Sequence, residues 1–101
     1  MSYRDVPMNA NGEASDNSPL GGYGGFVVVK LEAVGPANRT QFAEGYVDGV
    51  KVICASASDN SVPNVISNAV SGFTMPVPPG STWKVRGTPG PHVEIRWCAR
   101  F

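Results

Sequence analysis

The side chains that could take part in chemistry are few and lie far apart along the chain. His92 is the only histidine, and the sequence has no CxxC pair, GxSxG, HExxH or phosphate-binding loop. A catalytic histidine needs a nucleophile or a carboxylate beside it, and a zinc site needs further ligands at a characteristic spacing. We therefore expect no catalytic residue, no metal and no cofactor, and we assign His92 to a turn or to the surface.

The two cysteines, Cys54 and Cys98, are too few for a disulfide scaffold. Alternation places Cys54 on an apolar strand face with Val50 and Val52, and places Cys98 on the polar face of its strand with Arg96. Cytoplasmic synthesis favours free thiols. We expect two unpaired and partly buried cysteines.

Two tryptophans, Trp83 and Trp97, could stack against sugar rings, but each alternates with apolar neighbours at core positions of a strand. Burial is the favoured interpretation. A basic stripe near the end of the chain could bind a polyanion, and its members are Lys84, Arg86, Arg96 and Arg100. Eight basic residues balance eight acidic ones, so we expect no nucleic acid partner and interpret the stripe as a solvated or subunit-facing sheet surface.

Composition indicates one small all-β domain. The chain has 101 residues with 12 glycines and 9 prolines, and only 16% of its residues are charged, against about a quarter in typical domains. Many turns and little charged helix surface are typical of β proteins. No apolar run is long enough to cross a bilayer, so we expect no membrane insertion. No signal-peptide core follows Met1, so we expect the chain to be synthesised in a cytoplasm.

Alternating or β-branched runs predict the strands. The clearest is the closing run, in which Val93, Ile95 and Trp97 alternate with charged residues. Phe26–Val34 is rich in β-branched residues. The other predicted strands cover residues 41–47 and 50–57, which form a hairpin around Asp48-Gly49, and residues 73–77 and 82–86.

Two parts of the chain are harder to assign. Apolar residues in 61–70 recur at helical spacing, yet the segment is short and β-branched, so a short helix and an irregular crossing loop stay equally open. Pro76 cannot donate to a ladder, which places its strand at an edge or at its own end. Residues 1–25 are interpreted as a polar arm and a glycine-rich hinge, which either lies on a partner subunit or links to an upstream part.

These elements predict a single antiparallel β-sandwich or small jelly roll over residues 26–101. We expect six to seven short strands, with one short helix possible near 61–70.

The segment Phe73-Thr-Met-Pro-Val-Pro-Pro-Gly-Ser-Thr-Trp-Lys-Val85 is followed by a turn and a closing alternating strand. In this pattern the C-terminal third resembles the head, or tip, domains of bacteriophage tail fibres and tail spikes. The resemblance implies a homotrimer, in contact with other virion or fibre subunits, whose exposed loops bind a host-surface glycan or protein without catalysis. It also implies location in the virion tail.

No binding residue of that family can be transferred, since such loops differ with their receptors. Candidate contacts are therefore chosen for exposure and polarity in predicted loops, namely Asn38, Arg39, Asp59, Asn60 and His92. Two other functions stay open. One is a structural virion component, such as a decoration, knob or collar protein whose arm clasps a neighbour, and the other is a free-standing carbohydrate-binding lectin module.

Overall fold

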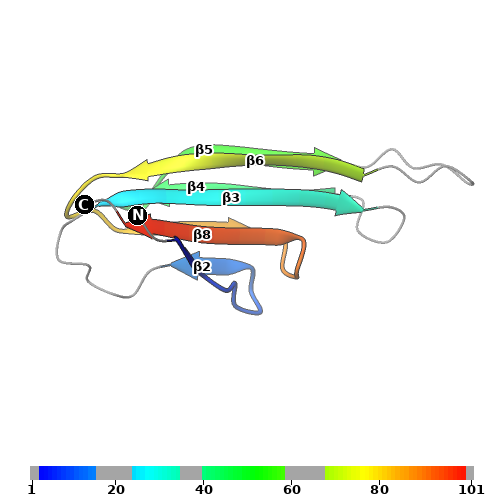
Figure 1. The fold of residues 1–101 in the computed structure, drawn as a ribbon, viewed down its shortest axis with the longest axis horizontal. Coiled ribbons are helices and arrows are strands. Elements are labelled where there is room, and N and C mark those ends of the chain that lie inside the picture. Colours follow the sequence, from blue (N-terminus) through cyan, green and yellow to red (C-terminus); the bar gives the residue numbers. More distant parts are fainter. Residues whose placement is uncertain (1–2, 16–23, 35–39, 59–67, 100–101) are drawn as a thin grey trace, which may run out of the picture.

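The computed structural model describes residues 3–15, 24–34, 40–58 and 68–99, which form eight strands and no helix (Figure 1). The strands are β1 (Tyr3–Asp5), β2 (Glu13–Ser15), β3 (Gly25–Val34), β4 (Thr40–Val47), β5 (Val50–Ser58), β6 (Asn68–Val77), β7 (Trp83–Gly87) and β8 (Val93–Ala99). In this part of the chain no helix is long and apolar enough to cross a membrane.

The strands form two four-stranded antiparallel sheets that face each other. Sheet A has the order β1-β8-β3-β6 and sheet B the order β2-β7-β4-β5. The first strand thus pairs with the last, the second with the seventh, the third with the sixth and the fourth with the fifth. A long hairpin wound around a sandwich gives this pairing, which is the jelly-roll topology. The predicted all-β sandwich is confirmed, and the strand order identifies it as a jelly roll.

The core lies between the sheets, where the strand alternation points the apolar side chains. Val27, Val29 and Leu31 of β3 are buried, as are Val85 of β7 and Ile95 of β8. In strands successive side chains face opposite sides, so these positions form one continuous apolar layer. The burial of this layer is the main force that holds the two sheets together.

The two tryptophans pack against each other across the interior. Trp83 of sheet B and Trp97 of sheet A lie with ring centroids 5.8 Å apart and planes 17° from parallel. Each is only 5% exposed, so the predicted burial is confirmed, while Arg96 beside Trp97 faces solvent. Neither buried indole N–H has a hydrogen-bond partner among the described residues. The free energy gained by burial of two large rings offsets the cost of these unpaired N–H groups.

The Asp48-Gly49 hairpin is confirmed, and its aspartate also holds a second connection. Asp48 and Gly49 have φ of 51° and 81°, as a tight turn between twisted strands requires. The Asp48 carboxylate accepts hydrogen bonds from the Thr82 N–H at 2.9 Å and the Ser81 hydroxyl at 2.8 Å. The Thr82 N–H first, and then Ser81, lower the pKa of this carboxyl below its usual value. This turn is therefore tied to the residues that lead into β7.

The N-terminal segment differs from the expected arm. β1 pairs with β8, and β2 pairs with β7, so residues 3–15 supply one edge strand to each sheet. These two strands account for the count of eight in place of six or seven. Each is three residues long, too short to show a periodicity, and its pairing depends on a partner more than 70 residues away.

Predictions near β6 are confirmed in part. Pro76 lies in β6, an edge strand of sheet A, as its missing N–H required. Asn68–Val70, the last part of the ambiguous segment 61–70, is strand. Residues 61–67 lie outside the described residues.

The predicted partial burial of the two cysteines was wrong, although both are thiols outside any disulfide, as expected. Cys54 is exposed, because β5 turns Ile53 and Ala55 inward and leaves Val52 outside. Ile53 and Ala55 are in register with Gly45 and Ala43 of β4, and this register determines which face of β5 points inward. Cys98 shares the outer face with Arg96 but is buried, since it lies in β8 between β1 and Phe26 of β3.

Candidate functional site

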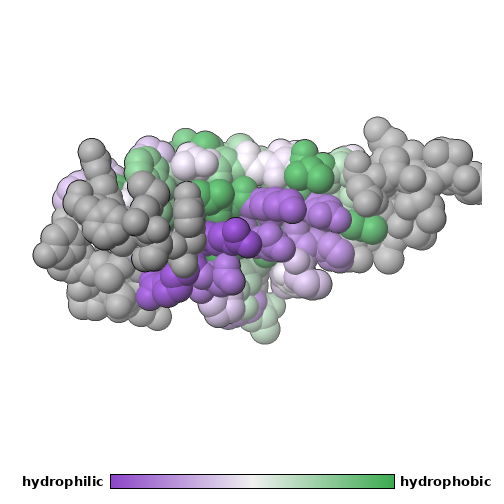
Figure 2. Space-filling model, in the orientation of Figure 1, coloured by the Kyte–Doolittle hydropathy of each residue, from purple (hydrophilic) through white to green (hydrophobic). Residues whose placement is uncertain are grey.

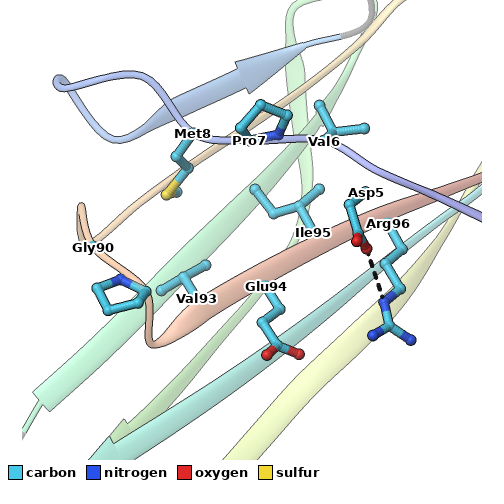
Figure 3. Close-up of a pocket in the computed structure, with 10 residues that line it drawn as sticks. Asp5, Val6, Pro7, Met8, Gly90, Val93, Glu94, Ile95 and Arg96 are labelled. Carbon is cyan, nitrogen blue, oxygen red and sulfur yellow. Dashed lines mark hydrogen bonds and ion pairs between the residues drawn. The ribbon is translucent and has the colours of Figure 1, made fainter.

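An open groove lies where β1 leaves β8, and it is the candidate functional site (Figure 3). It has a volume of about 590 Å³. Its walls come from the segment that follows β1, from the turn before β8 and from β8 itself. The lining residues are Asp5, Val6, Pro7, Met8, Gly90, Pro91, Val93, Glu94, Ile95 and Arg96.

The groove begins where Pro7 ends the pairing of β1 with β8. β1 pairs with β8 as far as Asp5, and the Val6 N–H still donates to the Ile95 carbonyl at 2.9 Å. Pro7 has no N–H, so the ladder cannot continue through it. The chain then leaves β8 toward Met8, and the space between the two segments is the groove.

The groove wall formed by residues 5–8 is followed by a compact turn, residues 9–13, that holds it in place. The Asn9 side-chain oxygen accepts hydrogen bonds from the N–H groups of Asn11 at 2.9 Å and Glu13 at 3.0 Å. Gly12 closes the turn with φ of 78°, and a Cβ there would meet the Gly87 carbonyl oxygen. The turn is thus fixed to β7, and the groove has a built wall on this side.

The two sides of β8 give the groove different chemistry. Val93 and Ile95 point toward the Val6–Met8 segment, whereas Glu94 and Arg96 lie on the other side of the strand (Figure 3). Val93 and Ile95 are buried, and Glu94 and Arg96 are exposed. The site therefore combines apolar walls with a charged rim.

One ion pair lies on this rim. The Arg96 Nε donates to the Asp5 carboxylate at 3.2 Å, with 55% and 86% of the respective side chains exposed. Exposed pairs of this kind contribute about 0–1 kcal/mol. Neither group is therefore held strongly by the other, and a polar ligand can recruit both.

His92 is the one predicted site residue that the structure describes, and it lies next to the groove. It lines a smaller hollow of about 60 Å³ with Lys30, Glu32, Pro91 and Glu94. Its carbonyl accepts a hydrogen bond from the Glu32 N–H at 3.0 Å. Pro91 and Glu94 line both hollows, so His92 is part of the same surface region.

The other predicted contacts, Asn38, Arg39, Asp59 and Asn60, lie outside the described residues. The strand ends that flank them are described. Val34, which ends β3, is in register with Asn68 at the start of β6, and Thr40 at the start of β4 is in register with Ser58, which ends β5. β8 begins toward the same end of the sandwich (Figure 1). The topology thus connects all three predicted loops at one end.

The predicted basic stripe is not one surface. Lys84 and Arg86 belong to β7 of sheet B, and Arg96 belongs to β8 of sheet A, so they lie on opposite outer faces of the sandwich. Arg86 lies in register between Glu13 and Glu44, and Arg96 is paired with Asp5. Arg100 lies outside the described residues.

The sequence did not predict the groove. Its wall comes from residues 5–8, which the composition predicts to be part of the polar arm. The local signal for this wall is Val6-Pro7-Met8, an apolar pair around a proline in an otherwise polar stretch. Within the described part of the chain, no three histidine, cysteine or acidic side chains are grouped to hold a metal ion. The groove's geometry is suited to binding through apolar contact and charged hydrogen bonds.

Compared with protein-family models and with curated proteins, the sequence matches none of them. Function is therefore inferred from the fold, from the groove and from the resemblance of the C-terminal third.

Proposed function

We propose that this protein is a non-catalytic binding module that acts as the receptor-binding tip of a phage or phage-like tail fibre, located in the virion tail. Its ligand is a glycan or protein on the host surface. The observation that supports this most is the groove of mixed chemistry beside the end of the jelly roll to which the predicted loops connect. Binding residues are concentrated on loops that a rigid scaffold positions.

The groove's composition suits a glycan. Pro7, Met8 and Pro91 offer apolar surface for the apolar face of a sugar ring. Asp5 and Arg96 offer an acceptor and a planar donor to hydroxyl or carboxylate groups. A protein side chain with an apolar stem and a charged end would use the same groups.

The exposed rim also favours adhesion over catalysis. Catalytic groups commonly lie in sites that exclude water. The rim carboxylates Asp5 and Glu94 are exposed instead. They can therefore recognise a ligand but lack the desolvated environment that activates a general acid or base.

The test is binding of the full chain to a glycan array and to host cells, with two matched variants. Arg96→Gln removes the charge at the groove, and Arg86→Gln removes an exposed arginine from the opposite face. We expect at least tenfold weaker binding for Arg96→Gln and less than a twofold change for Arg86→Gln. No binding by the wild type, or equal losses in both variants, would contradict the proposal. Glycan binding by a monomer found outside virions would favour the free-standing lectin module.

A second candidate is a structural virion component, and the long uncharged strand β6 favours it because an unguarded edge suits assembly. In this candidate β6 makes the contact with a neighbour, since residues 3–15 pair within their own chain. Presence of the protein in purified particles, without any measurable receptor binding, would select this candidate.

A further inference from the structure

The strands β5 and β6 together form one long edge of the sandwich. β5 is the last strand of sheet B and β6 the last of sheet A, and the two lie against each other across the layers (Figure 1). β5 has 9 residues and β6 has 10. No described strand pairs with their outer sides, so each presents a row of backbone hydrogen-bonding groups.

The β6 half of this edge lacks most of the features that usually prevent strand addition. β6 contains no charged residue, and its single proline, Pro76, is one position from its end. β5 is better guarded, with Lys51 and an irregular register opposite Gly45 and Tyr46. At the other side of the sandwich, β1 and β2 are only three residues long. Short strands, lysines and bulges are the common protection of edges, so the outer side of β6 is the least protected.

The hydrophobic core also continues out to this edge. Ile53 of β5 and Phe73 of β6 pack against the buried core but are themselves only half-buried. Val52 is 55% exposed and Val70 63% exposed. Over β6 the surface is green to white, whereas the strongly hydrophilic band runs over β3 and β8 (Figure 2). An apolar strip along an unpaired edge is typical of an interface.

We propose that a second copy of this chain covers this edge, with β6 pairing antiparallel to β6 of the partner about a two-fold axis. Two features select a second copy as the occupant. An uncharged strand meets itself without placing like charges opposite each other. A partner must also cover two stacked strands, one in each sheet, and another copy presents the same pair at the same spacing.

The edge has the area of a specific interface. Ten strand residues span about 33 Å, and the shortest dimension of the molecule, through both sheets, is 21 Å. The product is about 700 Å² per copy, or about 1,400 Å² in total, within the range of about 1,200–2,000 Å² for specific interfaces. The inference does not depend on the groove or on its ligand, and a dimer would replace the homotrimer that the fibre-tip resemblance implies.

The test is sedimentation velocity of the full chain at 1–100 µM, beside two variants. Val70→Lys puts a charge at an exposed position of β6, and Phe42→Lys puts one at an exposed position of β4, a central strand. For the wild type and Phe42→Lys we expect twice the monomer mass of 10.6 kDa. For Val70→Lys we expect a dissociation constant at least tenfold higher, with an unchanged circular dichroism spectrum.

Hydrogen exchange locates the contact. Within Asn68–Met75, the amides that point away from β3 should exchange slowly in the dimer and faster in Val70→Lys. If Val70→Lys fails to fold, Thr74→Lys, at another exposed position of β6, replaces it. Three results would overturn the proposal: a wild-type monomer at 100 µM, a trimer as the fibre-tip resemblance implies, or a dimer that neither Val70→Lys nor Thr74→Lys weakens.

Discussion

Gly45 and Met75 allow a direct test of how the two sheets face each other. Gly45 lies on the inner side of β4 in sheet B, and Met75 is fully buried in β6 of sheet A. A Cβ at Gly45 would lie 2.6 Å from the Met75 Sδ and 2.9 Å from the Ile53 Cγ2. The missing side chain of Gly45 therefore leaves the space that the Met75 thioether fills.

The free energies of unfolding follow from this contact. Gly45→Ala overpacks the interface and should cost about 1–3 kcal/mol. Met75→Ala leaves a cavity and should cost about 2–5 kcal/mol. In the double variant the new methyl group occupies part of the space that Met75 vacates, so the overpacking is relieved. The double variant should therefore cost about 1–3 kcal/mol less than the sum of the single variants.

The assay is urea denaturation at 25 °C, followed by the fluorescence of the buried tryptophans. Gly49→Ala is the matched control, because a Cβ at this turn position has no neighbour within 4 Å. Its cost should add to that of Met75→Ala within about 0.5 kcal/mol. If the Gly45 and Met75 effects also add within that limit, the two residues do not share a space and the packing of the sheets is wrong.

Three further predictions follow from particular residues. With a thiol reagent, Cys54 should react in the native protein and Cys98 only after unfolding, since the first is exposed and the second buried; equal rates would contradict the placement of Cys98. The Asp48 carboxyl has a lowered pKa in the folded chain, so its stabilisation is present above its usual value of 3.8 and is lost as pH falls below it. Wild type should therefore exceed Asp48→Asn in unfolding free energy at pH 6 and lose that advantage toward pH 3, whereas a constant difference would refute this role. Gly12→Ala should destabilise more than Gly80→Ala by at least about 1 kcal/mol, because both have positive φ but only Gly12 has a carbonyl in the path of a Cβ; equal losses in thermal denaturation would exclude that contact.

The sequence predicted the parts of the fold whose structure is determined by the pattern of neighbouring residues alone. In β8 the alternation of Val93, Ile95 and Trp97 with charged residues leaves only one face for the core. The Asp48-Gly49 pair specifies its turn through backbone conformation alone. These features need no knowledge of distant partners, which explains why they could be read directly.

The features that were missed depend on partners distant in sequence. β1 and β2 are strands because β8 and β7 offer them free edges. In β5 both strand faces carry apolar residues, so Val52 and Ile53 compete for the core, and the register with β4 decides for Ile53. Cys98 shares its face with charged residues but is covered by its neighbours on either side.

The candidate site shows the same limit. Polarity in loops predicted His92, which lies beside the groove. The groove itself joins residues 5–8 to residues 90–96, across almost the whole chain, and only the pairing of β1 with β8 brings them together. A single sequence contains no signal for that pairing.

The groove is the centre of the functional account, and its occupancy can be measured directly. Hydrogen exchange of the full chain should be recorded with and without the best glycan from the array, or with host-surface extract. The account predicts slower exchange confined to residues 5–8 and 90–96, and loss of this protection in Arg96→Gln. Protection over β7 on the opposite face, or no protection anywhere at saturating ligand, would contradict it.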